Sequence, residues 1–272
     1  MTRKIRFVIG GFGNVGEQVA RKVLADRSGQ LEIAAIVARN REKARAKMMD
    51  IGLDVPIISA AEAPDHARIL VESSTYDGFR DVVEPALIAG CHVIAVSVGA
   101  LSVNLDLIDL AASHNATLHI ASGTLPGLDI LRAAREGDLQ EVTLKSTILL
   151  RSLVHEPYIK NNSIDLDRAM TEKVHIFSGT AREAAHHFPR HFNVAVSLSL
   201  AGLGLDKTMV EIHADGRLPG AKHVIVVKSD VVALEMTSEN FPSPENDRTS
   251  RIVAPTIIAA LRELGAPLRI GS

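Results

Sequence analysis

A glycine cluster near the start of the chain has the spacing of a phosphate-binding turn. In the stretch Gly11-Phe12-Gly13-Asn14-Val15-Gly16, glycine occupies the first, third and sixth positions, directly after an apolar run and before a helix-like segment. Because glycine lacks a Cβ, the backbone can turn tightly and a pyrophosphate can approach bare N–H groups at a helix N-terminus. The spacing predicts a dinucleotide-binding site, and a glycine turn without a ligand is the alternative.

The residues after the second predicted strand bear on the choice between NAD and NADP. An acidic residue there would accept hydrogen bonds from the ribose hydroxyls of NAD. This chain reads Val37-Ala38-Arg39-Asn40-Arg41 instead. Arg39 or Arg41 could pair with the 2′-phosphate of NADP and Asn40 could add a hydrogen bond, unless these are solvated groups at a helix start. The sequence favours NADP, or the use of both cofactors.

Three of the eleven histidines are spaced in a way that invites a metal site. His187 and His191 lie four residues apart and follow His186, but Pro189 interrupts the helix that would place them on one face. No cluster of cysteines or carboxylates completes a ligand set. The sequence therefore predicts no metal site.

His223 is the better candidate for chemistry. It lies at the start of a predicted strand, just after the turn Gly216–Gly220. A rigid strand end can hold an imidazole that transfers protons near neutral pH. The alternative is an exposed histidine at a strand end with no chemical role.

Two kinds of sheet must position these residues. Up to residue 120, strand-like runs alternate with helix-like segments, which predicts a parallel sheet built from crossover units. The predicted strands are Ile5–Ile9, Glu32–Val37, Ile69–Glu72, His92–Val98 and Ala116–Ile120, and the helices between them are Glu17–Leu24, Arg41–Met49, Val82–Ala89 and Leu105–Ala112.

The pattern changes after residue 125. A strand at Glu141–Leu150 is followed by two helices and then by three strands that we expect to form an antiparallel meander. Those helices are Ala181–His187 and Asn193–Leu203, and those strands are Met209–Ala214, His223–Lys228 and Val231–Met236. A loop over Phe241–Ser250 leads to a last helix at Ile252–Leu264.

We therefore expect an α/β protein with a Rossmann-type domain over residues 1–125. A second, α+β domain with a mostly antiparallel sheet is expected over 126–245. The C-terminal helix lies within 246–272 and could pack back on the first domain.

Composition excludes several classes of function. The 272 residues carry a net charge of −2 and only 3% aromatic residues, which suits neither a basic nucleic-acid surface nor a base-stacking platform. Cys91 is the single cysteine, so no internal disulfide can form and a reducing compartment fits. The chain shows neither a signal-peptide pattern after Met1 nor an apolar stretch of membrane-spanning length. We expect a soluble cytoplasmic protein that binds neither nucleic acid nor membranes.

Longer motifs resemble the L-aspartate dehydrogenase family along nearly the whole chain. The matching stretches are Ile9–Gly16, Val71–Thr75, Ser97–Leu101, Ala121–Asp129, Phe177–Asp206, Ala221–Ile225 and Pro242–Ser250. The resemblance implies an N-terminal Rossmann domain, a second domain for substrate binding, catalysis and dimerisation, and a homodimer.

The resemblance also implies roles for individual residues. The family's active-site histidine maps onto His223, and its NAD(P)-contacting asparagine maps onto Asn193. A cofactor-contacting position that is usually alanine maps onto Thr124. The chain departs from the family at His191, where relatives have asparagine, and at Lys222 in the Ala-Lys pair before the active-site histidine.

The implied reaction is oxidative deamination of L-aspartate to oxaloacetate and ammonia, or its reverse, with NADP or NAD and with His223 as general base. The substrate carboxylates need polar or cationic partners, for which His191, Lys222, Arg248, Thr249 and Ser250 are candidates. Lys222 could equally face solvent, and Arg248-Thr249-Ser250 could cap the last helix. Two other functions stay open: an NAD(P)-dependent enzyme for another small amino acid, imine or semialdehyde, and a non-catalytic NAD(P)-binding regulator.

Overall fold

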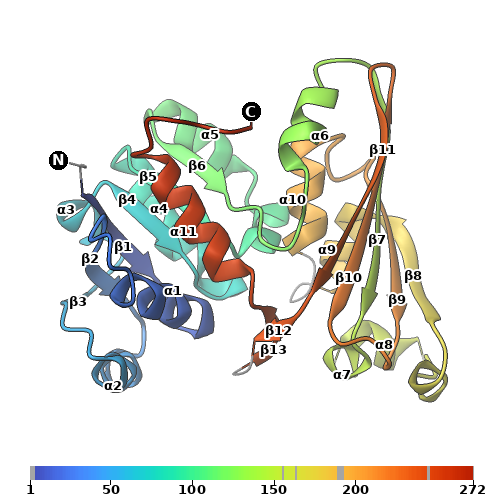
Figure 1. Cartoon of the computed structure of the whole chain (residues 1–272), viewed down its shortest axis with the longest axis horizontal. Coiled ribbons are helices and arrows are strands. Elements are labelled where there is room, and N and C mark those ends of the chain that lie inside the picture. Colours follow the sequence, from blue (N-terminus) through green and yellow to red (C-terminus); the bar gives the residue numbers. More distant parts are fainter. Residues whose placement is uncertain (1–3, 155, 163, 189–192, 244–245, 272) are drawn as a thin grey trace. The chain divides into compact units, whose positions relative to one another are not determined.

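The computed structural model describes residues 4–154, 156–162, 164–188, 193–243 and 246–271. The chain divides into two compact units (Figure 1). The first unit runs to Gly123 and also takes in Val253–Arg269, and the second unit comprises Thr124–Ile252 and the last residues.

The first unit is built on a six-stranded parallel sheet in the order β3-β2-β1-β4-β5-β6. Its strands are β1 (Ile5–Gly10), β2 (Leu31–Val37), β3 (Ile57–Ile58), β4 (Ile69–Glu72), β5 (His92–Ala95) and β6 (Thr117–Ile120). The strand order runs outward from β1 in one direction and from β4 in the other. A topological switch point therefore lies between the carboxyl ends of β1 and β4, where open α/β sheets bind their ligands.

Helices α1 (Asn14–Leu24), α2 (Arg41–Ile51) and α11 (Val253–Glu263) share one apolar core with this sheet. Helix α11 buries Ala254, Ile257 and Leu261, a helical repeat of one apolar face, and Figure 1 shows it in red alongside α1. The other helical segments of the unit are α3 (Ala63–His66), η1 (Tyr76–Gly78), α4 (Phe79–Ile88), η2 (Val98–Val103) and α5 (Asp106–Ser113).

The second unit holds a mixed, mostly antiparallel five-stranded sheet in the order β11-β10-β7-β9-β8. Its strands are β7 (Leu139–Ile148), β8 (Val174–Thr180), β9 (Met209–Ala214), β10 (Ala221–Ser229) and β11 (Ala233–Asn240). Helix α10 (Asn193–Ala201) packs against both α6 (Leu128–Ala134) and α9 (Ala181–His187), and α9 and α10 contact the sheet. The short helices are α7 (Leu150–Leu153), α8 (Pro157–Asn161) and η3 (Asp167–Met170).

The predicted meander is wrong in one pairing. β10 and β11 form an antiparallel hairpin as expected, but β9 and β10 do not pair. β7 lies between them, antiparallel to β10 and parallel to β9. The turn at Gly216–Gly220 therefore belongs to a connection that passes over β7.

Four further strands were not predicted from the sequence. β3 and β8 extend the edges of the two sheets. The expected loop at Phe241–Ser250 contains β12 (Pro242–Ser243), which pairs antiparallel with β13 (Asn246–Ser250).

Candidate functional site

The glycine turn lies between β1 and α1, at the carboxyl edge of the first sheet. Gly11 has a φ of +102°, and a Cβ built there would lie 2.7 Å from the carbonyl oxygen of Ser73. A Cβ at Gly16 would overlap the carbonyl oxygen of Gly11. Both positions therefore require glycine for reasons internal to the protein.

Gly13 differs, because the protein itself leaves room there. Among the described residues beyond its chain neighbours, no atom lies within 4 Å of the place a Cβ would take. Gly13 is the N-cap of the eleven-residue α1 and makes no side-chain cap, so N–H groups of the first turn remain for a ligand. An open approach to bare backbone at a helix N-terminus fits a dinucleotide pyrophosphate.

The other residues of the turn have structural contacts. Phe12 is buried, and Val15 packs against the core cluster. Asn14 accepts a hydrogen bond from Gln18 at 3.3 Å, and its Nδ2 is buried without a partner in the described part of the chain.

Arg39 and Asn40 follow β2, next to the glycine turn. Arg39 Nη2 donates to Thr75 Oγ1 at 3.1 Å, which holds the guanidinium beside the loop after β4. Asn40 is the N-cap of α2, and its Oδ1 accepts from the backbone N–H of Lys43 at 2.9 Å. Asn40 can therefore offer a ligand its Nδ2 group but not its capping oxygen.

His223 lies on β10 in the second unit, between two serines of neighbouring strands. Its register partners are Ser146 on β7 and Ser238 on β11. His223 is 5% exposed, Ser146 is fully buried, and His223 Nδ1 lies 3.0 Å from Ser146 Oγ. This hydrogen bond occupies Nδ1 and leaves Nε2 as the nitrogen available for proton transfer.

The surroundings of His223 change its acidity. Burial lowers the pKa of the imidazole from 6.5 to about 4 because the charged form is poorly solvated there. At pH 7 the ring is therefore neutral, as a general base requires. Its low pKa also links protonation of His223 to unfolding.

This linkage predicts a loss of stability in mild acid. The unfolded chain takes up a proton on His223 below pH 6.5, whereas the folded chain resists protonation until about pH 4. The free energy of unfolding should fall by about 2 kcal/mol between pH 7 and pH 5 from this residue alone. Urea titrations of the wild type and of His223→Asn at both pH values measure it. Parallel losses in the two proteins would contradict the prediction, and His114→Asn, an exposed site, is the control.

Thr124 and Asn193, the other predicted cofactor contacts, also belong to the second unit. The carbonyl of Thr124 accepts from Ser238 Oγ at 2.9 Å, which ties its loop to the strand beside His223. Thr124 Oγ1 is buried with no hydrogen-bond partner among the described residues. Asn193 is the first residue of α10.

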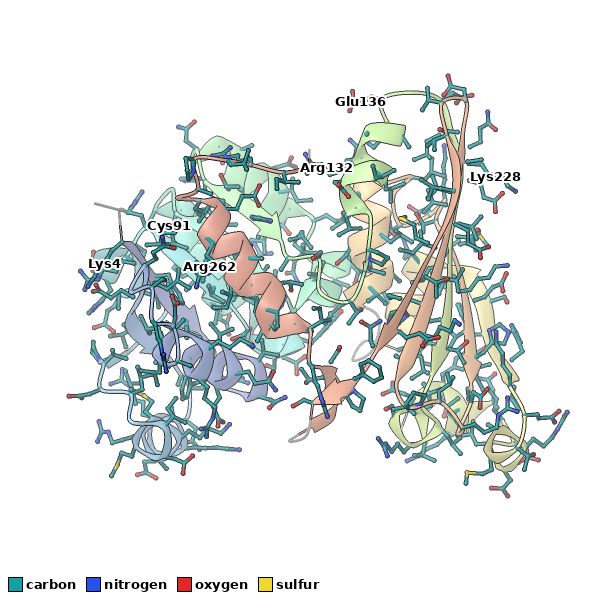
Figure 2. All side chains as sticks on the ribbon, viewed as in Figure 1. Lys4, Cys91, Arg132, Glu136, Lys228 and Arg262 are labelled. Atoms are coloured by element: carbon teal, nitrogen blue, oxygen red, sulfur yellow. The ribbon has the colours of Figure 1, made fainter. Side chains whose placement is uncertain are left out.

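The structure does not bring Lys222 together with His223. Alternation along β10 puts the two side chains on opposite faces of the sheet, and Lys222 Nζ pairs with Glu239 at 3.1 Å. Lys228, six residues on, shares the Lys222 face, and Figure 2 shows it extending away from α6 and α10. Lys222 therefore occupies the solvent-side position that the sequence left open.

The remaining substrate candidates lie near the start of α11 or outside the described residues. Arg248, Thr249 and Ser250 belong to β13, and Ser250 Oγ donates to the carbonyl of Phe241 at 3.3 Å. The same hydroxyl accepts from the N–H of Ile252 at 3.4 Å, just before α11 begins. His191 lies outside the described residues.

The histidines that suggested a metal have aromatic neighbours. The His187 ring packs 4.8 Å from Tyr158 and 5.2 Å from His186, measured between ring centroids. In the described ranges, no three His, Cys, Asp or Glu side chains gather as a metal site. Likewise, no helix in those ranges is long and apolar enough to cross a bilayer.

Sequence reasoning gave no role to three residues of these sites. Ser146 and Ser238 flank His223 only through strand pairing over long sequence separations. Glu72 is fully buried at the end of β4. In the sequence it closes the apolar run Ile69-Leu70-Val71 and lies in the family-matching stretch Val71–Thr75.

Two family models match the chain. One, described as "Aspartate dehydrogenase, C-terminal", matches residues 129–264. The other, "Homoserine dehydrogenase, NAD binding domain", matches residues 11–121.

Similar proteins cover nearly the full length of the chain. L-aspartate dehydrogenase 3 of Bordetella bronchiseptica is 36% identical over 264 residues, which is 97% of this chain and 96% of the relative. L-aspartate dehydrogenase of Bradyrhizobium diazoefficiens is also 36% identical, over 99% of this chain and 95% of the relative. A crystal structure of aspartate dehydrogenase from Thermotoga maritima shares the fold, with a TM-score of 0.74, 20% identity, and coverage of 99% and 100%.

Proposed function

Because the chain belongs to the aspartate dehydrogenase family, we propose that it oxidatively deaminates L-aspartate to oxaloacetate and ammonia, or runs the reverse reaction. The observation that carries the proposal is the similarity to L-aspartate dehydrogenases over 97% and 99% of the chain. A buried, neutral histidine in the second unit supports it. The chain is an oxidoreductase whose substrate is a small molecule.

The cofactor is NAD or NADP, and when bound it accepts a hydride from Cα of the substrate. The proposed pyrophosphate contacts are the residues of the glycine turn: Gly11, Phe12, Gly13, Asn14, Val15 and Gly16. Arg39 and Asn40 are proposed for the ribose end, and Thr124 and Asn193 as further contacts. The open approach at Gly13 and the buried, unpartnered Thr124 Oγ1 support this set.

His223 is the general base in this proposal. When Nδ1–H donates to Ser146 Oγ, the lone pair of Nε2 is free for the substrate. Nε2 takes the proton that the α-ammonium group must lose before a hydride can leave. That proton passes to solvent, so Nε2 is free again to take a proton from the attacking water and to return it to the departing nitrogen. Burial favours this cycle because a weakly held proton is readily given back.

The carboxylates of aspartate require donors, since a buried unpaired charge is costly. His191, Arg248, Thr249 and Ser250 remain the proposed partners. Lys222 is the carboxylate partner that the structure supports least, because its ammonium group already pairs with Glu239 on the face away from His223.

An activity assay tests the function. Purified protein mixed with aspartate and NADP or NAD should generate reduced nicotinamide, followed by its absorbance. The departures at His191 and Lys222 favour one competing function, the oxidation of another small amino acid or a semialdehyde. Turnover of such a compound but not of aspartate would show that this compound, and not aspartate, is the substrate. Binding of NAD or NADP without turnover of aspartate or of any other compound tested would indicate a regulatory protein.

We also propose that the chain forms a homodimer, the assembly that the family resemblance implies. Light scattering after size-exclusion chromatography measures the mass against the 29.2 kDa of one chain. A monomeric mass at micromolar protein concentration would contradict the proposed homodimer.

Replacing Arg39 should change the choice of cofactor. Arg39→Ala removes the guanidinium held beside Thr75, so the dissociation constant of NADP should rise about 10–100-fold while that of NAD stays within about twofold. Fluorescence titration with each reduced cofactor measures both constants. Arg45→Ala, an exposed arginine farther along α2, is the matched control. Equal losses for NADP and NAD would contradict a 2′-phosphate contact.

A further inference from the structure

Glu72 is a buried carboxyl group that the proposed chemistry does not use. It is the last residue of β4, is fully buried, and lies beside the carboxyl ends of β1 and β5. Burial raises the pKa of this carboxyl, so keeping it there has an energetic cost. A buried charge-bearing group at a topological switch point calls for a reason beyond packing.

The two oxygens of Glu72 each hold a different loop. Oε1 accepts hydrogen bonds from the N–H and the Oγ of Ser74, both at 2.7 Å, in the loop after β4. Oε2 accepts from the N–H groups of Ser97 at 3.0 Å and Val96 at 3.3 Å, in the loop after β5. Ser97 Oγ donates to the carbonyl of Ser74 at 3.0 Å and closes the bridge.

The loop fixed by Glu72 extends to the two groups proposed to hold the cofactor. Ser73 Oγ donates to the carbonyl of Gly11 at 2.8 Å, and the N–H of Ser73 donates to the carbonyl of Gly10. Two residues on, Thr75 Oγ1 accepts from Arg39. The glycine turn, the arginine at the ribose end and the loop after β5 are thus joined through three consecutive residues anchored by one carboxylate.

We propose that Glu72 is a positioning residue for the nicotinamide dinucleotide: it holds the loops after β4 and β5 in the arrangement that binds the cofactor. This inference rests on the proposed function, since it takes that cofactor as the ligand. Glu72 does not touch the reacting atoms. It lowers the cost of binding by ordering the site beforehand.

Glutamine cannot replace glutamate here. Both oxygens of Glu72 face N–H donors, so whichever way an amide is turned, its NH₂ group opposes a backbone N–H. Glu72→Gln should therefore release one of the two loops while preserving the size of the side chain. Glu62 offers a matched control, because its carboxylate accepts from the N–H and the Oγ of Ser59 but lies in the segment after the edge strand β3.

The experiment is a fluorescence titration of NADPH and NADH into wild type, Glu72→Gln and Glu62→Gln, at a temperature at which circular dichroism shows all three folded. We expect Glu72→Gln to weaken the binding of NADPH and of NADH, each by about 10-fold or more. Glu62→Gln should stay within about twofold of wild type. The loss of NADH affinity distinguishes Glu72→Gln from Arg39→Ala, which should weaken NADP selectively.

Each outcome decides the inference. Wild-type affinity in Glu72→Gln, or an equal loss in Glu62→Gln, would overturn it. If Glu72→Gln does not fold, Ser74→Ala replaces it, where about a threefold loss supports the role and no change overturns it. A wild type that binds neither cofactor would refute the proposed function instead, which keeps the two failures distinct.

Discussion

Alanine in place of His223 should lower kcat for aspartate about 1,000-fold and leave cofactor affinity unchanged. The variant removes Nε2, which in the proposed mechanism accepts the proton of the amine. It also removes the ring held at 3.0 Å by Ser146. The predicted cofactor contacts on the glycine turn belong to the other unit and are not altered. Steady-state kinetics and NADPH titration together measure the two effects.

The control for this variant is His213→Ala on the same sheet. His213 lies on β9, pairs with His175 in register and is register partner of Thr147, one position from Ser146. Alternation therefore points it to the face opposite His223, so its loss should change kcat no more than about twofold. If His223→Ala retains more than a tenth of wild-type kcat, the base must be another group.

Valine at Gly13 should weaken NADP and NAD by about 100-fold or more without unfolding the protein. At Gly13 no described atom beyond the chain neighbours lies within 4 Å of the place a Cβ would take, and the φ of −80° suits valine. What the side chain would meet is a phosphate approaching the start of α1. Cofactor titration and thermal unfolding measure the two halves of this prediction.

Gly11→Ala provides the contrast. There the Cβ would lie 2.7 Å from backbone and the φ of +102° disfavours any side chain, so the strain should cost about 1–3 kcal/mol of stability. Normal cofactor affinity in Gly13→Val would rule out a ligand at this turn, and a strong loss of stability there would show that the space is not open.

The sequence predicted most accurately the elements whose structure depends on neighbouring residues. The glycine turn, with its helix and flanking strands, follows from contiguous residues, and β4, β9 and α9 have the predicted bounds. The C-terminal helix also follows from its own apolar repeat. These elements needed no knowledge of distant partners.

The sequence could not predict the contacts that depend on pairing between strands far apart along the chain. Ser146 meets His223 from 77 residues away because β7 inserts between β9 and β10, and nothing local to either strand specifies that order. In the sequence, Glu72 is an ordinary charged residue at the end of a strand, and its partners Val96 and Ser97 come from the loop after β5. The sequence therefore predicted the glycine turn of the candidate site. It did not predict the hydrogen bonds that hold the imidazole of His223 and the loops after β4 and β5.

The position of α11 in the first unit has a consequence for how the protein is made. The ribosome releases residues 4–123 long before Val253–Glu263, yet the core around α1 needs Ala254, Ile257 and Leu261 to be complete. A nascent chain therefore carries an unfinished nucleotide-binding core, with apolar surface uncovered, until Val253–Glu263 has been synthesised. A truncation that removes only the final helix should leave the amino-terminal half prone to aggregate, although every residue of the glycine turn is still present.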